Sequence, residues 1–182
     1  MRATHHEIDG LMVVDPEVHQ DSRGFFLESF NQQAFGHATG VDATFVQDNH
    51  SRSSKGVLRG LHYQSPQPQG KLVRCVRGSV FDVAVDIRAS SPTFGKVAVV
   101  ELSEENHRQL WVPEGFAHGF LVTSDVADVL YKTTGYYSPG SSHTIAWDDP
   151  DLAIPWPLGG EKPILSSGDS AGVALVDAVL FP

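Results

Sequence analysis

Short stretches in which apolar and polar residues alternate run along most of this chain, separated by glycine, proline, asparagine and serine. In the clearest stretch, residues 80–88, every second residue is large and apolar: Phe81, Val83, Val85 and Ile87. The residues between them are small or charged: Asp82, Ala84, Asp86 and Arg88. A period of two places these sets on opposite faces of a strand. We therefore expect a strand with one core face and one partly polar face.

Comparable runs predict further strands at residues 11–14, 25–29, 44–50, 57–63, 71–76, 96–102, 109–112, 119–123 and 126–134. Helical patterns are scarce. Asn31 is a suitable N-cap for a short helix that reaches His37 and ends at Gly40. Residues 103–106 resemble a single turn, and Asp169 is placed to cap a short helix over residues 171–180.

Many strands and few helices predict an all-β fold. A length of 182 residues favours one domain, and no repeat or composition shift divides the chain. An all-β domain of this size is usually a sandwich or a barrel. The even spacing of the strands, with glycine in the turns, favours a jelly-roll barrel with a few short helices, formed by residues 1–182.

The net charge of the chain limits the kinds of molecule that it is expected to bind. Thirteen Lys and Arg residues against 22 Asp and Glu residues give a net charge of −9, which repels a nucleic acid. No apolar stretch is long enough to span a bilayer, and the N-terminus lacks the apolar core of a signal peptide. The single cysteine, Cys75, excludes an internal disulfide framework and is best explained by packing. We expect a cytoplasmic protein without a membrane or nucleic-acid partner.

Nine histidines raise the question of a bound metal. Metal sites in barrels commonly use two histidines one residue apart, because that spacing puts both rings on one strand face. The only adjacent pair is His5 and His6, near the terminus. His62 and His118 each stand alone, and the positions flanking His62 at the required spacing are Gly60 and Gln64. We therefore predict no metal site.

Several polar residues admit both a structural and a functional interpretation. Strict alternation puts Arg59 and His62 on opposite faces of a strand, which argues against a shared site unless Gly60 introduces a bulge. The other ambiguous positions are Lys71 at a strand start, Arg23 in a turn, the possible amide pair of Gln47 and Asn49, the tyrosines Tyr131, Tyr136 and Tyr137, and Asp169, which on its own is best explained as a helix cap.

Taken together, ordered motifs along the chain resemble one known family. They are residues 21–28 (DSRGFFLE), 47–51 (QDNHS), 56–64 (GVLRGLHYQ), 70–74 (GKLVR), 81–88 (FDVAVDIR) followed by 91–95 (SPTFG), 113–120 (PEGFAHGF), 130–133 (LYKT) and 154–157 (IPWP). In this order they resemble the dTDP-4-dehydrorhamnose 3,5-epimerases, nucleotide-sugar epimerases with a cupin-like barrel, also called a double-stranded β-helix. The resemblance extends from about residue 5 to the C-terminus.

The resemblance implies both fold and chemistry. The implied substrate is dTDP-4-dehydro-6-deoxy-glucose, whose ketone acidifies the protons on both neighbouring carbons. Epimerisation at C3 and C5 removes a proton, passes through an enolate and returns a proton to the other face, on the way to dTDP-rhamnose. This chemistry needs a base, an acid on the opposite face and a cation for the enolate oxygen, with no cofactor. The family also implies a homodimer that exchanges an N-terminal strand.

The family's functional residues match this chain position by position. The implied catalytic set is His62 as base, Asp169 as its supporting carboxylate, Lys71 as the enolate-stabilising cation and Tyr131 as acid. The implied substrate contacts are Arg23 and Arg59 at the diphosphate, Glu28, Gln47, Asp48 and Asn49 around the nucleotide, Tyr137 at the base, and His118 with its partner Asp82. Arg23 and Glu28 are implied to serve the neighbouring subunit.

Two positions depart from the family pattern. Gly168 stands where the family usually has lysine, and Ser142 stands where it often has glutamate, so ligand contacts at these positions are expected to differ. Three alternatives remain open from the sequence: an epimerase acting at a single carbon, a non-catalytic sugar-nucleotide-binding barrel, and a metal-dependent cupin dioxygenase or isomerase.

Overall fold

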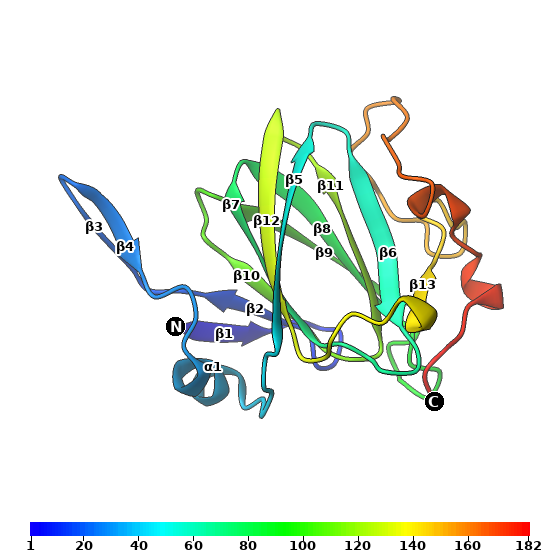
Figure 1. Cartoon of the computed structure of the whole chain (residues 1–182), viewed down its shortest axis with the longest axis horizontal. Coiled ribbons are helices and arrows are strands. Elements are labelled where there is room, and N and C mark those ends of the chain that lie inside the picture. Colours follow the sequence, from blue (N-terminus) through cyan, green and yellow to red (C-terminus); the bar gives the residue numbers. More distant parts are fainter.

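Two antiparallel sheets face each other in the computed structural model, which describes residues 1–182 (Figure 1). The six-stranded sheet has the order β1 (Arg2–His5), β2 (Met12–Asp15), β10 (Gln109–Val112), β7 (Lys71–Arg77), β12 (Val126–Thr133) and β5 (Gln47–Ser54). The five-stranded sheet has the order β13 (Ser142–Thr144), β6 (Leu58–Gln64), β11 (Phe116–Val122), β8 (Ser79–Asp86) and β9 (Val97–Ser103). This is the predicted all-β jelly-roll barrel.

A separate hairpin of β3 (Val18–Asp21) and β4 (Gly24–Leu27) projects away from the barrel, and we call it the arm (Figure 1). The helix predicted after Asn31 is confirmed as α1 (Gln32–Thr39), which ends at the left-handed Gly40. The Asn31 side chain accepts hydrogen bonds from the N–H groups of Gln33 and Ala34 at 3.0 and 3.1 Å. No helix in the fold has the length and apolar character needed to cross a membrane.

Every predicted strand overlaps an observed one, but β1, β3 and β13 were not predicted. These strands have at most four residues each, and β1 and β3 carry mainly exposed side chains, so they show little alternation. The single turn predicted at residues 103–106 is confirmed directly after β9, and in it Asn106 and Ser103 exchange side-chain to backbone hydrogen bonds of 3.1 Å.

The predicted C-terminal helix over residues 171–180 is wrong. The segment contains two short 3₁₀ turns instead, η2 (Asp169–Ala171) and η3 (Leu175–Asp177). Between them Val173 pairs with the strand region at Ile145, donating to Thr144 O at 3.0 Å and accepting from Ala146 N at 2.7 Å. The backbone groups that a helix would use are therefore committed to the edge of the five-stranded sheet.

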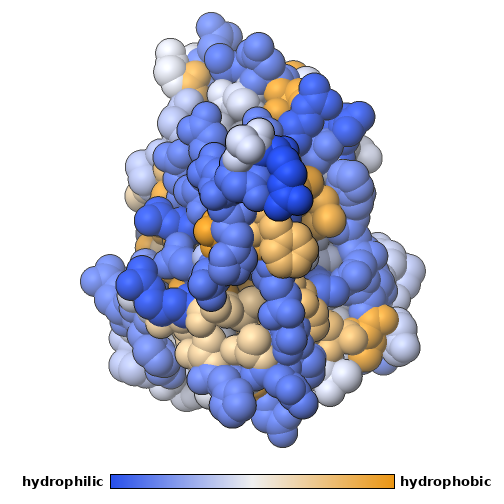
Figure 2. All heavy atoms as spheres, turned by 90° about the vertical axis from the view of Figure 1, so that its left-hand side faces the viewer, coloured by the Kyte–Doolittle hydropathy of each residue, from blue (hydrophilic) through white to orange (hydrophobic).

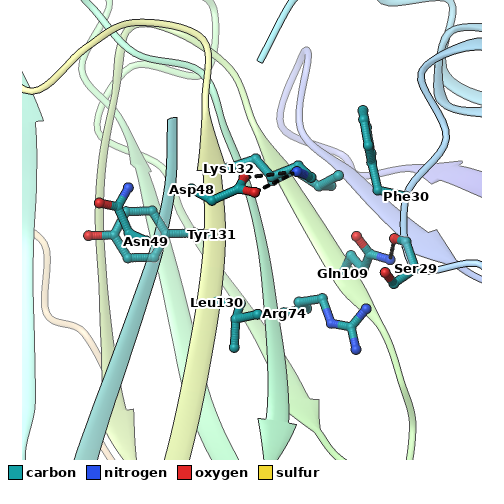
Figure 3. Close-up of a pocket in the computed structure, with 10 residues that line it drawn as sticks. Ser29, Phe30, Asp48, Asn49, Arg74, Gln109, Leu130, Tyr131 and Lys132 are labelled. Atoms are coloured by element: carbon teal, nitrogen blue, oxygen red, sulfur yellow. Dashed lines mark hydrogen bonds and ion pairs between the residues drawn. The ribbon is translucent and has the colours of Figure 1, made fainter. Parts of the chain in front are cut away.

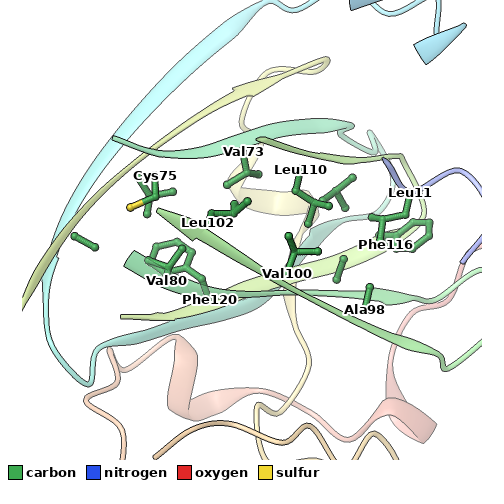
Figure 4. Packing of buried hydrophobic residues seen from close by; sticks show 14 of the residues in the cluster. Leu11, Val73, Cys75, Val80, Ala98, Val100, Leu102, Leu110, Phe116 and Phe120 are labelled. Carbon is green, nitrogen blue, oxygen red and sulfur yellow. The ribbon is translucent and has the colours of Figure 1, made fainter. Parts of the chain in front are cut away.

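The space between the sheets is filled by an apolar cluster that draws on β7 to β12 (Figure 4). Strand β8 contributes Val80 and Ala84 to it. The opposite face of β8, with Val83 and Val85, packs beneath the C-terminal segment in a second cluster. Both faces of β8 are thus buried, and the face predicted to be partly polar lies inside the barrel, where Asp82 is fully buried.

The interior changes from apolar to polar along the strands. On β7 the inward row continues from Cys75 and Val73 to Lys71, and on the neighbouring β12 it continues from Val129 to Tyr131. Because the register pairs Val129 with Cys75 and Tyr131 with Val73, both rows become polar at the same end of the barrel. That end holds the candidate site.

Candidate active site

The β6 strand brings Arg59 and His62 to the same cavity, as a bulge at Gly60 would allow. The pairing of β6 with β11 shifts register here, so that His118 lies opposite His62 but Phe120 lies opposite Arg59. Gly60 has φ +125°, and a Cβ on it would lie 2.5 Å from Gly119 Cα. Only glycine permits this approach of the two backbones, and the extra residue turns Arg59 to the side of His62.

His62 is paired with Asp169, although 107 residues separate them in the sequence. His62 Nε2 lies 2.8 Å from Asp169 Oδ1, and the same oxygen accepts the Gly60 N–H at 2.9 Å. Burial lowers the pKa of His62, and the charge of Lys71 lowers it further against the opposing effect of Asp169. His62 is therefore neutral near pH 7, while 44 % of its side chain is exposed to the cavity.

The Asp169 carboxylate is held in its ionised form. Burial acts to raise the pKa of Asp169, but hydrogen bonds from Ser166 and from the Gly60 N–H, together with the nearby His62, hold it below its usual value. The sequence position of Asp169 alone suggested a helix cap, but no helix forms over residues 171–180 for it to cap. Its side chain turns back toward β6 instead and orients the imidazole.

Lys71 is buried rather than solvated at its strand start, with 8 % relative exposure. Its Nζ donates a hydrogen bond to His62 O at 3.1 Å. Burial lowers the pKa of Lys71 to about 8, against the opposing attraction of Asp82. The ammonium is thus charged at neutral pH but poorly solvated, which strengthens its interaction with any anion that develops in the cavity.

A second histidine–aspartate pair lies deeper in the barrel. His118 Nε2 on β11 is 2.8 Å from Asp82 Oδ1 on β8, and the two side chains are 8 % and 0 % exposed. Asp82 Oδ2 has no hydrogen-bond partner. His118 lines the cavity, whereas Asp82 lies beneath it.

Tyr131 approaches the cavity from the six-stranded sheet, whereas His62 belongs to the five-stranded one. Burial raises the pKa of Tyr131 against the opposing effect of Arg59, so the phenol stays protonated. Asn49 on β5 lies opposite Tyr131 in the register and beside it in Figure 3. Asn49 Oδ1 accepts a hydrogen bond from Gln47 Nε2 at 2.8 Å, which confirms the amide pair.

The cavity has a volume of about 380 Å³. Its charged or titratable lining consists of Arg59, His62, Lys71, His118 and the tyrosines 63, 131 and 137, with no aspartate or glutamate. The cavity wall therefore presents cations and no carboxylate in a protein of net charge −9, with Asp169 and Asp82 behind the two histidines. Ser142 and Gly168, the two departures from the family pattern, also line it.

Of the predicted substrate contacts, Gln47 and Asn49 lie on β5 next to Tyr137 and Tyr131 without lining the cavity, and three others lie away from it within one chain. Arg23 lies on the arm, with its side chain 88 % exposed and paired with Asp21 at 2.6 Å. Glu28 lies at the base of the arm and accepts from Asn31 at 3.2 Å. Asp48 points to the outer face of the sheet, where it meets Lys132 at 2.8 Å beside a smaller pocket (Figure 3).

Several residues at the site were not predicted, among them Tyr63 and Gln64 in the cavity wall and Ser166 behind it. Ser166 donates to Asp169 Oδ2 through its hydroxyl at 2.5 Å and through its backbone N–H at 3.2 Å. The spacing Ser-x-x-Asp at residues 166–169 is the signature of a capping box and was visible in the sequence.

No group of three His, Cys, Asp or Glu side chains is arranged to hold a metal ion.

The jelly-roll barrel places an oriented imidazole, a buried ammonium and a phenol around one cavity, an arrangement that can move protons to and from a bound molecule. The family model for dTDP-4-dehydrorhamnose 3,5-epimerase matches residues 5–177. The chain belongs to this family of isomerases.

Close relatives match over the whole chain. A dTDP-4-dehydrorhamnose 3,5-epimerase of Pseudomonas aeruginosa is 55 % identical over 182 residues and covers 100 % of both chains. One from Shigella flexneri is 57 % identical and covers 100 % of this chain and 99 % of its own. The solved structure of a dTDP-6-deoxy-D-glucose-3,5-epimerase from Legionella pneumophila, in complex with dTDP-4-keto-L-rhamnose, has a TM-score of 0.94 at 53 % identity and covers 98 % of this chain and 94 % of its own.

Proposed function

We propose that this protein epimerises dTDP-4-dehydro-6-deoxy-glucose at C3 and C5, giving dTDP-4-dehydrorhamnose for dTDP-rhamnose biosynthesis. One observation carries the proposal: His62 and Tyr131 enter the same cavity from opposite sheets, with Lys71 buried beside them. Inverting a carbon through an enolate requires proton removal on one face and proton return on the other. A base and an acid on two facing walls meet that requirement.

His62 is the base in this mechanism. It is neutral near pH 7, exposed to the cavity and oriented by a carboxylate 2.8 Å away. When His62 takes a proton from the carbon beside the ketone, Asp169 stabilises the imidazolium that forms. The proton leaves carbon as H⁺, and the bonding electrons move onto the ketone oxygen to give the enolate.

Lys71 stabilises the enolate oxygen, and Tyr131 returns a proton to the opposite face of the carbon. A preorganised cation at a developing oxyanion is usually a large contribution to catalysis. The phenol of Tyr131 keeps its proton because burial raises its pKa. Epimerisation at the second carbon uses the same groups once the sugar ring has repositioned.

Other residues in and around the cavity bind the nucleotide. Arg59 contacts the diphosphate, and its Nε already donates to Ser53 Oγ at 3.0 Å, which limits its mobility. Gln47 and Asn49 contact the nucleoside, Tyr137 lies against the base, and His118 hydrogen-bonds the substrate with support from Asp82. Asp48 lies on the outer face and contributes only indirectly, through the position of β5.

We also propose a homodimer in which the arms are exchanged. The arm leaves its own barrel with Phe25 and Phe26 60 % and 71 % exposed, and the face from which it projects shows apolar residues among hydrophilic ones (Figure 2). Strand β5 is an edge strand with one side unpaired. In the exchanged dimer, Arg23 and Glu28 complete the partner's site. Solution scattering showing a monomer would rule this out.

We further propose that the protein acts in the cytoplasm, since a nucleotide diphosphate sugar is too highly charged to cross a membrane unaided. Cell fractionation followed by an activity assay tests this location. Activity confined to a periplasmic or extracellular fraction would contradict it.

Hydrogen–deuterium exchange tests the reaction. The protein is incubated with dTDP-4-dehydro-6-deoxy-glucose in deuterated water, and the sugar is analysed by NMR and mass spectrometry. We expect deuterium at C3 and C5. Exchange at one carbon identifies a single-position epimerase, and ligand binding without exchange identifies a binding protein. Activity that is lost with a chelator and restored by a metal would indicate metal-dependent chemistry.

A further inference from the structure

Ser166 makes the tightest contact with the carboxylate that orients His62. Its hydroxyl donates to Asp169 Oδ2 at 2.5 Å, and its backbone N–H donates to the same oxygen at 3.2 Å. In return the Asp169 N–H donates to Ser166 Oγ at 3.1 Å. The two residues form a reciprocal box around the start of η2.

The two oxygens of Asp169 have separate partners. Oδ1 receives the Gly60 N–H and faces His62 Nε2, whereas Ser166 alone supplies the protein donors to Oδ2. A carboxylate held at both oxygens cannot rotate, so its Oδ1 stays directed at the imidazole. Because the Asp169 side chain is only 5 % exposed whereas Ser166 is exposed, Ser166 lies between Oδ2 and solvent and takes the place of water as its donor.

We propose that the Ser166 hydroxyl is a positioning residue for the reaction. It orients the Asp169 carboxylate and disperses part of its charge, and thereby sets both the orientation and the basicity of His62. This inference rests on the proposed function, because it assigns His62 the role of base. The competing explanation is that the box only stabilises the first turn of η2.

The two explanations predict different results for Ser166→Ala. Without the hydroxyl the carboxylate charge is less dispersed, so Asp169 holds the imidazolium form of His62 more strongly. We expect kcat to fall about 10-fold through loss of a charge-assisted hydrogen bond, with KM changed less than about 2-fold. The acidic limb of the pH profile of kcat/KM should move to higher pH. A purely structural role would lower the melting temperature without moving that limb.

Two further variants make the test specific. Ser166→Thr keeps a hydroxyl and should restore the rate and the pH profile of the unmodified protein. Ser167→Ala removes the hydroxyl of the adjacent exposed residue and should change neither. If Ser166→Ala does not fold, Ser166→Cys, which retains a weak donor, should show an intermediate shift.

An NMR titration of His62 separates this inference from the proposed function. The His62 signal is assigned with His62→Gln, and its pKa is measured with and without Ser166→Ala. A higher His62 pKa in the variant supports the inference even if the unmodified protein shows no exchange, which would refute only the proposed reaction. An unchanged His62 pKa, or equal effects of Ser166→Ala and Ser167→Ala, would overturn it.

Discussion

The barrel contains two histidine–aspartate pairs with the same geometry and different surroundings. Both have Nε2 to Oδ1 distances of 2.8 Å. His62 is 44 % exposed, and its partner Asp169 receives further hydrogen bonds from Ser166 and Gly60. His118 is 8 % exposed, and its partner Asp82 has one oxygen without any hydrogen-bond partner.

The comparison shows that two properties decide what such a pair can do: how deeply the histidine is buried, and whether the aspartate has hydrogen-bond donors other than the histidine. Asp169 receives hydrogen bonds from the Gly60 backbone and from Ser166, so its burial does not depend on His62 alone, and in the proposed reaction the imidazole is free to exchange protons with the substrate. Asp82 depends on His118 for its only hydrogen bond, so the pair stabilises a buried carboxylate as well as holding His118 in one orientation at the cavity. Mutations of the two histidines should therefore affect different properties.

Replacing the exposed histidine should have the largest effect on turnover. We expect His62→Ala to lower kcat by about 10³-fold, because general-base catalysis is lost, while binding of dTDP is largely kept. The unfolding free energy should fall by less than about 1 kcal/mol, since Asp169 retains its other donors. Steady-state kinetics and calorimetric titration with dTDP measure these effects. Unchanged turnover would contradict the assignment of His62 as base.

Replacing the buried histidine should chiefly affect stability. His118→Ala leaves Asp82 buried without a partner, which should cost about 3 kcal/mol of unfolding free energy. For a chain of this length that corresponds to a fall in Tm of roughly 6–12 °C. Thermal unfolding of the two alanine variants side by side provides the comparison. Equal losses of stability would mean that the two pairs do not differ as described.

Arg59 offers a control that lies in the same cavity but belongs to neither pair. Arg59→Ala should raise the Kd for dTDP about 10- to 30-fold through loss of a charge-assisted contact to phosphate, with kcat nearly unchanged. Titration calorimetry and steady-state kinetics measure the two quantities. A fall in kcat at unchanged affinity would assign Arg59 to catalysis instead.

The smallest expected effect is the pH response of Lys71. Its pKa of about 8 means that the rate should fall to about half near pH 8 as the ammonium loses its charge. The acidic limb should lie below pH 6.5, where His62 becomes protonated. The folded pKa of Lys71 lies below the unfolded value of 10.5, so the unfolded chain binds more protons between about pH 8 and 10.5. The contribution of Lys71 to stability therefore rises with pH in this window while activity falls. A rate that stays constant to pH 10 would contradict the role of Lys71.

Local pattern was sufficient for much of the fold. The alternation in residues 80–88, the cap at Asn31 and the even strand spacing predicted β8, α1 and the jelly-roll class. The prediction of a helix at the C-terminus was wrong, because Val173 pairs with the edge of the sheet instead. Helix propensity is a local property and carries no information about a strand that lies nearby in the fold. Local pattern also left open where the partly polar face of β8 lies, since alternation cannot tell whether such a face meets solvent or the barrel interior.

The sequence by itself determined most of the strands, the barrel class and, through ordered motifs, the family and the residue types of the site. Tertiary structure alone decided how those residues act. It brought Asp169 to His62, let Gly60 turn Arg59 to the same side, and buried Lys71 enough to lower its pKa. The physical reason is that a strand pattern specifies directions along one segment, whereas distance, burial and charge at a site arise between segments far apart in the chain.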